Sequence, residues 1–425
     1  MFAIIPGVAR LLWTQKQDIG PSPRSNFGLA YDSVRKLTYL FGGSVDSTDT
    51  WSWDGRYWTQ VSRFGPTRRT GHSMTFDTAR SCTVLFGGEP VAGQALRDTW
   101  VFDGAEWTQV EDIGPSLRTE HATAFDQNRG RLVLFGGLLR GDGVDGQWAR
   151  DTWEWDGATW TQVEDTGPAK RRSHCLAYDS DRKRTVLFGG LAELTDGSHQ
   201  FVNDTWDWDG TSWTQVGDTG PTARANAAMT STGSVVILHG GDSGTQLADT
   251  WQWASGAWSK VQELGPSPRR GHAMTYDTER KRIVLFGGEV ETTTGGMPVV
   301  QRLGDTWEAP ASSVAESPVA TNVTIAPNPF SFSAGIGLTV EFEIPRQNET
   351  AHYGIYLGPQ QSTPQPPTDV ILLVSSIPAG VTRANALVEP ARLAYVAQYL
   401  NVPLPGTAWV HTTLGDAAAQ LMLMA

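Results

Sequence analysis

The sequence predicts an all-β fold in which one four-stranded unit recurs six times and closes into a ring. One sequence motif recurs. In the copy that begins at Gly65 its four segments read GPTRRTGHSMTFD, CTVLFGG, DTWVFDG and EWTQV. The last copy ends at Trp307, and the missing WTQ stands before the first copy, from Trp13. Four strands in a period of 40 to 50 residues are typical of a β-propeller blade. Copies begin 45, 49, 53, 53 and 45 residues apart, at Gly20, Gly65, Gly114, Gly167, Gly220 and Gly265.

The first half of the motif predicts the inner strand and the second strand of each copy. Small and apolar residues alternate from His72 to Phe76, which suits an inner strand around a crowded axis. Asp77 then favours a tight turn, because its side chain can bond backbone groups two residues on. The next strand, Thr83 to Phe86, is apolar throughout, as expected where neighbouring blades cover both faces. It ends in a Gly-Gly pair, which permits positive φ and close backbone approach.

The third and fourth strands carry tryptophans and meet at an Asp-Gly turn. In the second copy these are Trp100, Asp103-Gly104 and Trp107. Tryptophan columns that recur at the repeat period indicate a shared core between sheets rather than a set of sugar platforms. Trp148 lies outside these columns, in the long loop of the third copy. It is the ring tryptophan that we expect to be exposed for contact.

Composition narrows the function classes. The chain has 425 residues and a formal net charge of −12, which disfavours nucleic-acid binding because that requires a basic face. No apolar run is long enough to span a membrane. The two cysteines, Cys82 and Cys175, belong to copies two apart in the ring. We therefore expect two unbridged thiols.

The order of the motifs resembles the kelch repeat. Arginine, a small-residue strand, Gly-Gly, an acidic strand start and tryptophan follow one another across about residues 10 to 309. The resemblance implies a six-bladed propeller, with strand 10–16 closing the sixth blade. Kelch propellers serve as protein-binding modules, sugar-processing enzymes and metal-assisted specifier proteins. The resemblance therefore implies a fold more than an activity.

One face of the expected ring is variable and the other uniform. Connections between the second and third strands emerge beside the blade-to-blade connections, while the opposite face holds only short turns. The variable loops are long in copies three, four and six, over residues 138–150, 191–203 and 289–304. Loops on a rigid scaffold commonly carry recognition, so we expect the ligand on this face, with Trp148 and Arg140 among its contacts.

An arginine column raises two alternatives. One arginine precedes each inner strand, near the channel mouth: Arg24, Arg69, Arg118, Arg171, Arg224 and Arg269. Such a ring would bind a carboxylate or phosphate through bidentate bonds, and arginines at this position contact acidic segments in peptide-binding kelch proteins. Alternatively, each arginine pairs with the aspartate that begins the third strand and pegs the inner strand in place. Those aspartates are Asp49, Asp98, Asp151, Asp204, Asp249 and Asp305.

Histidines offer two weaker metal hypotheses. His72, His121, His174 and His272 share a column three residues after the arginine, but residues one blade apart are poorly placed around one ion. We expect them to bond neighbouring backbone. Glu193, Asp196 and His199 resemble the acidic-histidine loop of kelch specifier proteins, although that motif leaves three residues in each gap and this loop leaves two. We expect no metal site and no cofactor.

The composition changes after the ring. Residues 310–319 are rich in Pro and Ser and suggest a linker. Short apolar alternations in residues 320–425 predict a β-sandwich, with a helix as the alternative for residues 389–400. The stretch from Ala326 to Phe330 resembles the start of Ig-like accessory domains at the ends of secreted bacterial proteins. That resemblance implies export to the medium or the cell surface, with a cytoplasmic location as the alternative.

These observations predict a monomeric, non-catalytic binding or scaffold protein. Its ligand would be a protein or a carbohydrate held on the loop face of residues 1–309. The alternative is a sugar-directed enzyme of oxidase, epimerase or lyase type, with its site at the channel mouth. The two differ in what they require: an enzyme needs converging polar groups with shifted pKa values in a deep pocket.

Overall fold

The computed structural model is an all-β protein. It describes residues 13–16, 19–43, 48–90, 93–141, 143, 146–233, 235–262, 265–294 and 297–311, together with seven strands beyond residue 320. These described residues contain strands and turns but no helix. Residues from Gln15 to Ala311 form one compact unit, and the segment from Ser312 onward belongs to a second.

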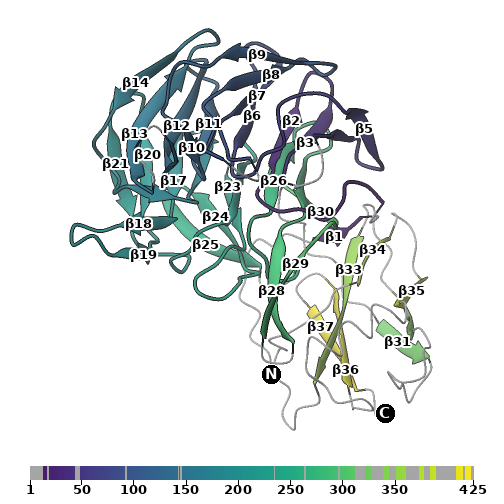
Figure 1. Ribbon diagram of the computed structural model, residues 1–425. Coiled ribbons are helices and arrows are strands. Elements are labelled where there is room, and N and C mark those ends of the chain that lie inside the picture. Colours follow the sequence, from purple (N-terminus) through teal and green to yellow (C-terminus); the bar gives the residue numbers. More distant parts are fainter. Residues whose placement is uncertain are drawn as a thin grey trace. The chain divides into compact units, whose positions relative to one another are not determined.

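Each copy of the repeat forms an antiparallel sheet, which we call a blade and number by its copy (Figure 1). Blade one contains β2 (Gly28–Asp32), β3 (Leu37–Phe41), β4 (Thr50–Trp53) and β5 (Trp58–Ser62). Blade two contains β6 (Ser73–Asp77), β7 (Cys82–Phe86), β8 (Thr99–Phe102) and β9 (Trp107–Glu111). Blade three contains β10 (Arg118–Thr119), β11 (Ala122–Asp126), β12 (Arg131–Leu139), β13 (Trp148–Trp155) and β14 (Trp160–Glu164).

The remaining blades repeat this order. Blade four contains β16 (Cys175–Asp179), β17 (Arg184–Phe188), β20 (Thr205–Trp208) and β21 (Trp213–Gly217). Blade five contains β22 (Ala228–Ser231), β23 (Val236–His239), β24 (Thr250–Ala254) and β25 (Ala257–Gln262). Blade six contains β26 (Ala273–Asp277), β27 (Arg282–Phe286), β30 (Thr306–Pro310) and β1 (Thr14–Gln15). The outer strand of blade six thus comes from the other end of the repeat region.

The N-terminal strand joins blade six through main-chain and side-chain contacts. The sheet order is β1-β30-β27-β26, with β1 beside β30 (Figure 1). The backbone N–H of Lys16 donates to the carbonyl of Thr306 at 2.7 Å, and the Lys16 ammonium lies 3.3 Å from the Glu308 carboxylate. Trp13 is buried, with 1% of its surface exposed. A strand supplied from the start of the repeat region therefore covers the last edge of the last sheet.

The inner strands contact one another in a cycle. Strand β2 touches β6, β6 touches β11, and the series continues through β16, β22 and β26 back to β2. Just before each inner strand, one backbone N–H donates to the carbonyl of the equivalent residue in the preceding blade, at 2.8–3.0 Å. The cycle returns to its start because the Asn26 N–H donates to Gly271. Its six members all have positive φ: Asn26, Gly71, Glu120, Ser173, Asn226 and Gly271.

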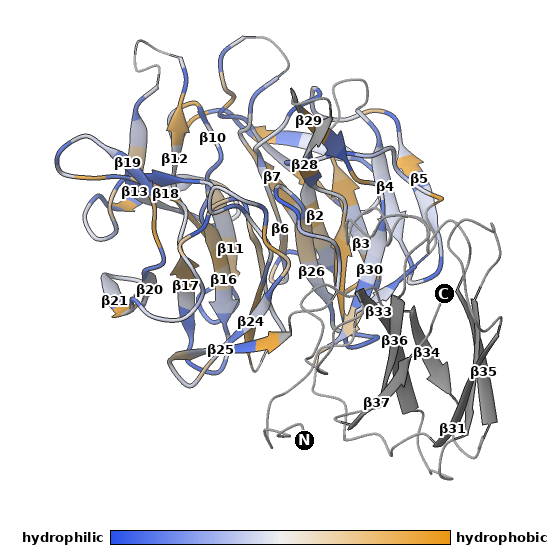
Figure 2. Ribbon diagram, turned by 90° about the horizontal axis from the view of Figure 1, so that it is seen from below, coloured by the Kyte–Doolittle hydropathy of each residue, from blue (hydrophilic) through white to orange (hydrophobic). Residues whose placement is uncertain are grey.

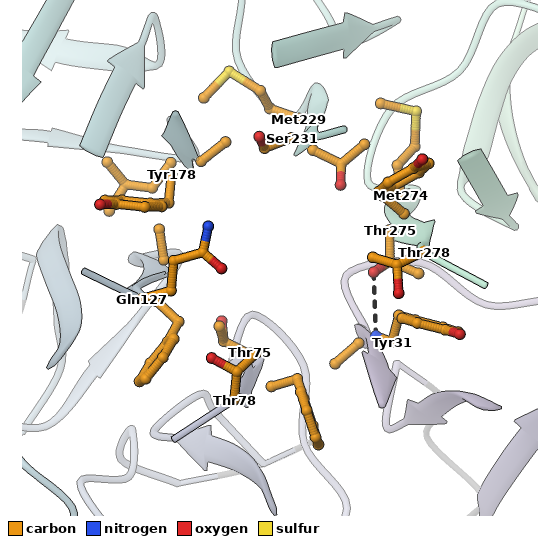
Figure 3. Close-up of a pocket in the computed structure, with 18 of the residues that line it drawn as sticks. Tyr31, Thr75, Thr78, Gln127, Tyr178, Met229, Ser231, Met274, Thr275 and Thr278 are labelled. Atoms are coloured by element: carbon orange, nitrogen blue, oxygen red, sulfur yellow. Dashed lines mark hydrogen bonds between the residues drawn. The ribbon is translucent and has the colours of Figure 1, made fainter. Parts of the chain in front are cut away.

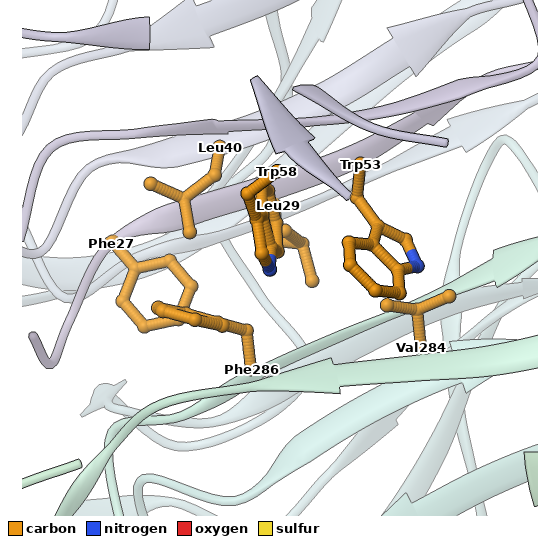
Figure 4. Close-up of a cluster of buried hydrophobic side chains, with 7 residues drawn as sticks. All are labelled: Phe27, Leu29, Leu40, Trp53, Trp58, Val284 and Phe286. Carbon is orange, nitrogen blue, oxygen red and sulfur yellow. The ribbon is translucent and has the colours of Figure 1, made fainter. Parts of the chain in front are cut away.

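The hydrophobic core lies between adjacent blades. The central leucine of each second strand is fully buried, as with Leu40 in β3 and Leu285 in β27. Figure 4 shows one such layer, in which Trp53 and Trp58 of blade one pack against Val284 and Phe286 of blade six. The outer-column tryptophans also donate a hydrogen bond to the preceding blade. Each indole N–H meets a threonine Oγ1 at 2.8–2.9 Å, from Trp58 to Thr306, Trp107 to Thr50, Trp160 to Thr99, Trp213 to Thr152 and Trp258 to Thr205.

The Gly-Gly pairs allow neighbouring blades to approach. Gly136 at the end of the apolar run in β12 has φ +62°, and a Cβ there would lie 2.8 Å from the Arg171 carbonyl oxygen of blade four. The same Cβ would lie 3.2 Å from the His174 ring. A side chain at this position would therefore separate two blades as well as strain the backbone.

The two ends of the blades differ in character. The turn face carries the Asp-led and Asp-Gly turns, and the loop face carries the second-to-third-strand loops and the blade connections. On the loop face the longer loops fold into hairpins: β12 with β13, β18 (Leu191–Glu193) with β19 (His199–Phe201), and β28 (Glu289–Thr294) with β29 (Met297–Arg302). Figure 2 shows hydrophobic colour along second strands such as β3 and β12 and hydrophilic colour along β19.

The second unit contains two antiparallel sheets in its described residues. One has the order β31-β32-β35, from β31 (Thr321–Ala326), β32 (Leu338–Glu343) and β35 (Arg383–Val388). The other has the order β34-β33-β36-β37, from β34 (Leu373–Ile377), β33 (Ala351–Pro359), β36 (Ala408–Leu414) and β37 (Ala417–Met422). The linker from residue 312 and the alternative helix at residues 389–400 lie outside the described residues.

Candidate functional site

The arginine column is buried and paired. In blade three, Nη1 and Nη2 of Arg118 each donate to one carboxylate oxygen of Asp151 at 2.8 Å. Nη1 also donates to the Gly136 carbonyl at 2.9 Å, and Nε donates to the Ser116 carbonyl at 3.0 Å. The indole N–H of Trp153 donates to the same Asp151 at 2.7 Å. The guanidinium therefore connects the start of the blade to the end of its second strand and the start of its third.

This arrangement recurs in every blade. All six arginines are between 0% and 1% exposed. Their partners follow the column: Arg24 with Asp49, Arg69 with Asp98, Arg171 with Asp204, Arg224 with Asp249 and Arg269 with Asp305. The geometry favours the second alternative from the sequence, in which the arginines peg the inner strands. A ligand carboxylate would have to displace an aspartate already bound to each guanidinium.

Five of these aspartates have a lowered pKa and remain ionised near pH 7. Burial alone would raise the pKa of Asp98, but hydrogen bonds and charge from Arg69 outweigh burial, and the net shift is downward. The same balance lowers the pKa of Asp151 beside Arg118. The unfolded chain therefore protonates these carboxyls first as pH falls. The stability that the pairs contribute is present above the ordinary aspartate pKa and is lost only in acid.

The histidine column packs between blades. His72 lies edge-on to Phe41 of blade one with 5.9 Å between ring centroids, and His174 lies edge-on to Phe135 at 5.4 Å. No ring nitrogen of His72, His174 or His272 meets strict hydrogen-bond geometry, although the backbone of Phe41 lies close enough to His72, and that of Phe135 to His174, to favour the charged ring. We expected these rings to bond neighbouring backbone; they lie against the backbone of the preceding blade and also pack against its aromatic side chains. In blade one the same position is Phe27, which packs edge-on against Phe286.

Burial makes these histidines a source of acid sensitivity. Desolvation, with the Arg69 charge adding to it, lowers the pKa of His72 from 6.5 to about 3. Below pH 6.5 the unfolded chain binds a proton that the folded chain excludes, so each such histidine costs about 1.4 kcal/mol of stability per pH unit. Replacing His72 by phenylalanine, the natural occupant in blade one, should shrink the stability loss between pH 7 and pH 5 by about 2 kcal/mol. Urea denaturation at the two pH values measures this; an unchanged loss in His72→Phe would contradict it.

Trp148 is buried, although its place in a long loop suggested that it would be exposed. It is only 6% exposed, because the His199 ring from β19 stacks on it at 4.0 Å between centroids and 15° between planes. The Arg172 guanidinium approaches the same indole at 5.1 Å and bonds both oxygens of Glu120 at 2.8 and 2.9 Å. Trp148 therefore fixes the hairpins of blades three and four against each other. Sequence position could not show this, because the contact joins two separate loops.

The remaining loop residues are spread along the loop face. Arg140 has a side chain that is 49% exposed and lies 2.6 Å from Glu89. Glu193 pairs across the hairpin with His199 and lies 3.5 Å from the Lys170 ammonium, while Asp196 accepts from Ser198 in the hairpin turn. Within the part of the chain that the structure describes, no group of three His, Cys, Asp or Glu residues is placed to hold a metal ion. Both described cysteines, Cys82 and Cys175, are free thiols.

A central cavity of about 320 Å³ lies among the inner strands. Residues from all six blades line it, from the second position of each inner strand to the first residues of the following turn. The position before the turn aspartate is aromatic in five copies, at Tyr31, Phe76, Phe125, Tyr178 and Tyr276. In copy five it is Ser231. Figure 3 shows the labelled side chains surrounding an open centre, toward which the Gln127 amide extends.

The lining of this cavity carries no charge. Its described residues include threonines, serines, methionines and aromatic rings but no Asp, Glu, His, Lys or Arg. Burial, with the charge of Asp277 adding to it, raises the pKa of Tyr31 to about 12. Burial and the charge of Asp126 raise that of Tyr178 to about 12. Both phenols therefore stay neutral near pH 7, and the cavity is a poor setting for acid–base catalysis.

Comparison with known proteins finds two similarities for the repeat region. Residues 105–288 match the model of the KLHDC2/KLHL20/DRC7 Kelch-repeats domain. A solved structure, that of YjhT, superposes with a TM-score of 0.53 at 16% identity, covering 66% of this chain and 98% of the other. The family model supports a kelch-repeat family for residues 105–288, and the likeness to YjhT supports the fold.

The comparisons define the fold of the repeat region and leave its ligand open. The comparison with curated proteins found no match. At 16% identity, the likeness to YjhT concerns the fold alone. The described residues include no helix that is long and apolar enough to cross a membrane.

Proposed function

We propose that this protein is a non-catalytic binding or scaffold protein that holds a protein partner on the loop face of its kelch domain. One observation carries the proposal. The charged residues that recur in every blade bond to other groups within the fold, whereas the loop hairpins differ between blades and present charged side chains to solvent. Internal ion pairs that recur in every blade build the scaffold, and irregular loops on it are the natural place for recognition.

We further propose the domain organisation that this function requires. Residues 1–309 form a six-bladed propeller closed by strand 10–16, residues 310–319 are a linker, and residues 320–425 form a β-sandwich accessory domain. The cycle of backbone hydrogen bonds from Asn26 to Gly271 and the bond from Lys16 to Thr306 support the closed ring. The resemblance near Ala326 to accessory modules of secreted bacterial proteins supports export.

The loop face offers mixed charge around its hairpins. Arg140 and Lys170 have side chains that are 49% and 47% exposed, and the Glu291 side chain is 41% exposed. These groups come from the neighbourhoods of three different hairpins. Both signs of charge on a rigid platform suit a protein surface with a complementary pattern, and such patterns contribute specificity and association rate.

The enzyme alternative has less support at the channel. A sugar-directed oxidase, epimerase or lyase needs an acid, a base or a redox group at the reacting atoms. The described lining of the central cavity supplies hydroxyls, an amide and apolar side chains. Burial raises the pKa of the Cys175 thiol to about 12, which disfavours the reactive thiolate.

The loop-face proposal is tested by transplanting a loop within the repeat. Residues 191–203 of blade four are replaced by the short loop of blade one, residues 44–48, so that the blade keeps a connection already used by this chain. Crosslinking in extracts of the native host, followed by mass spectrometry, compares the partners of this variant with those of the unmodified protein. We expect the main crosslinked partner to be lost.

A turn-face variant serves as the matched control. Lys36 and Glu279 form an exposed ion pair at 2.7 Å on the opposite face, and both are replaced by serine. This control should retain the partner. A partner kept by the transplanted loop, or lost from the turn-face control, would refute the loop face as the recognition surface.

A further inference from the structure

The central cavity has one narrow end and one open approach. At the loop side, the cycle of backbone hydrogen bonds through Asn26, Glu120 and Asn226 holds six chain segments together around the axis. None of the six cycle residues lines the cavity. At the turn side, the lining continues into the first turn residues, including Ser33, Thr78 and Gln127. A ligand would therefore enter from the turn face, opposite the proposed protein-binding loops.

The cavity wall is rich in hydrogen-bonding groups that are not charged. Each inner strand is the edge strand of its blade, so alternate backbone N–H and C=O groups face the channel. One of these, the Tyr31 N–H, donates to Thr275 Oγ1 of blade six at 3.2 Å (Figure 3). The hydroxyls of Thr75 and Thr123 bond each other at 2.8 Å across two blades. Such hydroxyls can exchange a partner in the wall for one on a ligand.

The charges nearest the rim are already neutralised. The turn aspartates pair with the arginine three residues later, as Asp77 does with Arg80 at 2.6 Å and Asp126 with Arg129 at 2.6 Å. The Asp277 carboxylate pairs with Arg280 at 2.7 Å. An ionic ligand would find no unpaired opposite charge in the described lining and would lose its hydration on entry. The site therefore favours a neutral ligand.

The repeat departs from its own pattern at this cavity. Blade five has Ser231, Thr232 and Gly233 where other blades have an aromatic residue, an aspartate and a turn residue, and all three line the cavity. The rim position that is Ser or Thr in blades one, two, four and six is Gln127 in blade three. A purely structural repeat gains nothing from irregularity here. A small side chain in one blade and a long amide in another give the cavity a shape and an orientation.

We propose that the central cavity binds a neutral, polyhydroxylated small molecule, a sugar or a polyol, entering from the turn face. Hydroxyls of such a ligand both donate to and accept from the threonine and backbone groups. Its C–H faces would pack against apolar wall residues such as Met229, Met274 and Leu176. A volume of about 320 Å³ is at the small end of ligand sites and suits one sugar unit. The ligand is either free in solution or the terminal unit of a glycan.

The experiment uses the full-length protein and a panel of matched probes. Saturation-transfer NMR at millimolar ligand screens neutral methyl glycosides and sugar alcohols against a uronic acid and an amino sugar, and calorimetry gives Kd for those that bind. We expect at least one neutral probe to bind and the charged analogues to bind about tenfold more weakly or worse. Disaccharides with the same terminal unit distinguish the two sources. If the ligand is the end of a glycan, the disaccharides bind as well as the monosaccharide; if it is a free monosaccharide, only the monosaccharide binds.

Two substitutions test whether the ligand binds in the central cavity. Ser231→Tyr restores the aromatic residue of the other blades and fills the opening, and Gln127→Ala removes the long rim amide. Ser231→Tyr should abolish binding, and Gln127→Ala should weaken it about tenfold, while Gln162→Ala on the exposed side of the outer strand β14 should leave Kd unchanged. Thermal melting checks that each variant is folded. The proposal is overturned by no binding across the neutral panel, by equal binding of charged probes, or by binding that survives Ser231→Tyr.

The cavity proposal and the loop-face proposal fail independently. Crosslinked partners report on the loops of blade four, and sugar binding reports on Ser231 and Gln127. A kelch domain with both sites would combine protein recognition on one face with small-molecule binding on the other.

Discussion

Replacing Arg118 by methionine is expected to lower the free energy of unfolding by about 3–5 kcal/mol. The side chain is 0% exposed, and its loss leaves the Asp151 carboxylate, only 20% exposed, without its cation. The Gly136 carbonyl would lose a donor as well. Urea denaturation of the purified protein at pH 7 measures the change.

Arg140→Met is the matched control for this substitution. Arg140 also pairs with a carboxylate, that of Glu89, but half of its side chain is in solvent. Exposed pairs contribute about 0–1 kcal/mol, so the control should remain close to the unmodified protein. Pairing Arg118→Met with Asp151→Asn should recover part of the loss, because no buried charge then lacks a partner. Equal, small effects of Arg118→Met and Arg140→Met would contradict the pegging role of the arginine column.

Deleting residues 1–16 should destabilise the ring at blade six. The deletion removes the outer strand β1, the buried Trp13 and the bonds of Lys16 to blade six. Loss of a buried tryptophan alone costs about 3–5 kcal/mol. The edge of β30 would also be left unpaired, which promotes association between chains. We expect a lower melting temperature and a shift to larger species in size-exclusion chromatography.

Deletion of residues 1–9 provides the comparison. This shorter truncation keeps residues 13–16, which complete blade six, so stability and size should match those of the full chain. Should the longer truncation melt at the same temperature as the shorter one, the closure of the ring by this strand would be wrong.

Much of the blade architecture follows from the sequence because it is encoded locally and repeated. The Gly-Gly pairs, the Asp-Gly turns and the tryptophan columns each identify a strand or a turn from a few neighbouring residues. The sheet orders agree with those assignments in all six copies, including β1 beside β30. A local signal that recurs six times is hard to misinterpret.

The site was less accessible to sequence reasoning because its contacts are long-range. The sequence left two roles open for Arg118: pairing with Asp151 or binding a ligand. The burial of its guanidinium, which the sequence does not show, favours the pairing. The position of Trp148 suggested exposure, but His199 from the next blade's hairpin covers it. The cavity was missed altogether. Its sequence signals were the irregular copy five, where Ser231 replaces an aromatic residue, and Gln127 of copy three, where four other copies have Ser or Thr.

The closed ring is the claim on which the scaffold, the buried arginines and the cavity all depend. Native-state hydrogen exchange, followed residue by residue, tests it most directly. The account predicts that the amide of Lys16 and the six cycle amides, from Asn26 through Gly271, exchange as slowly as the amides of second strands such as β3. Fast exchange at Lys16, or at any one amide of the cycle, would show that the ring is open and would contradict the account.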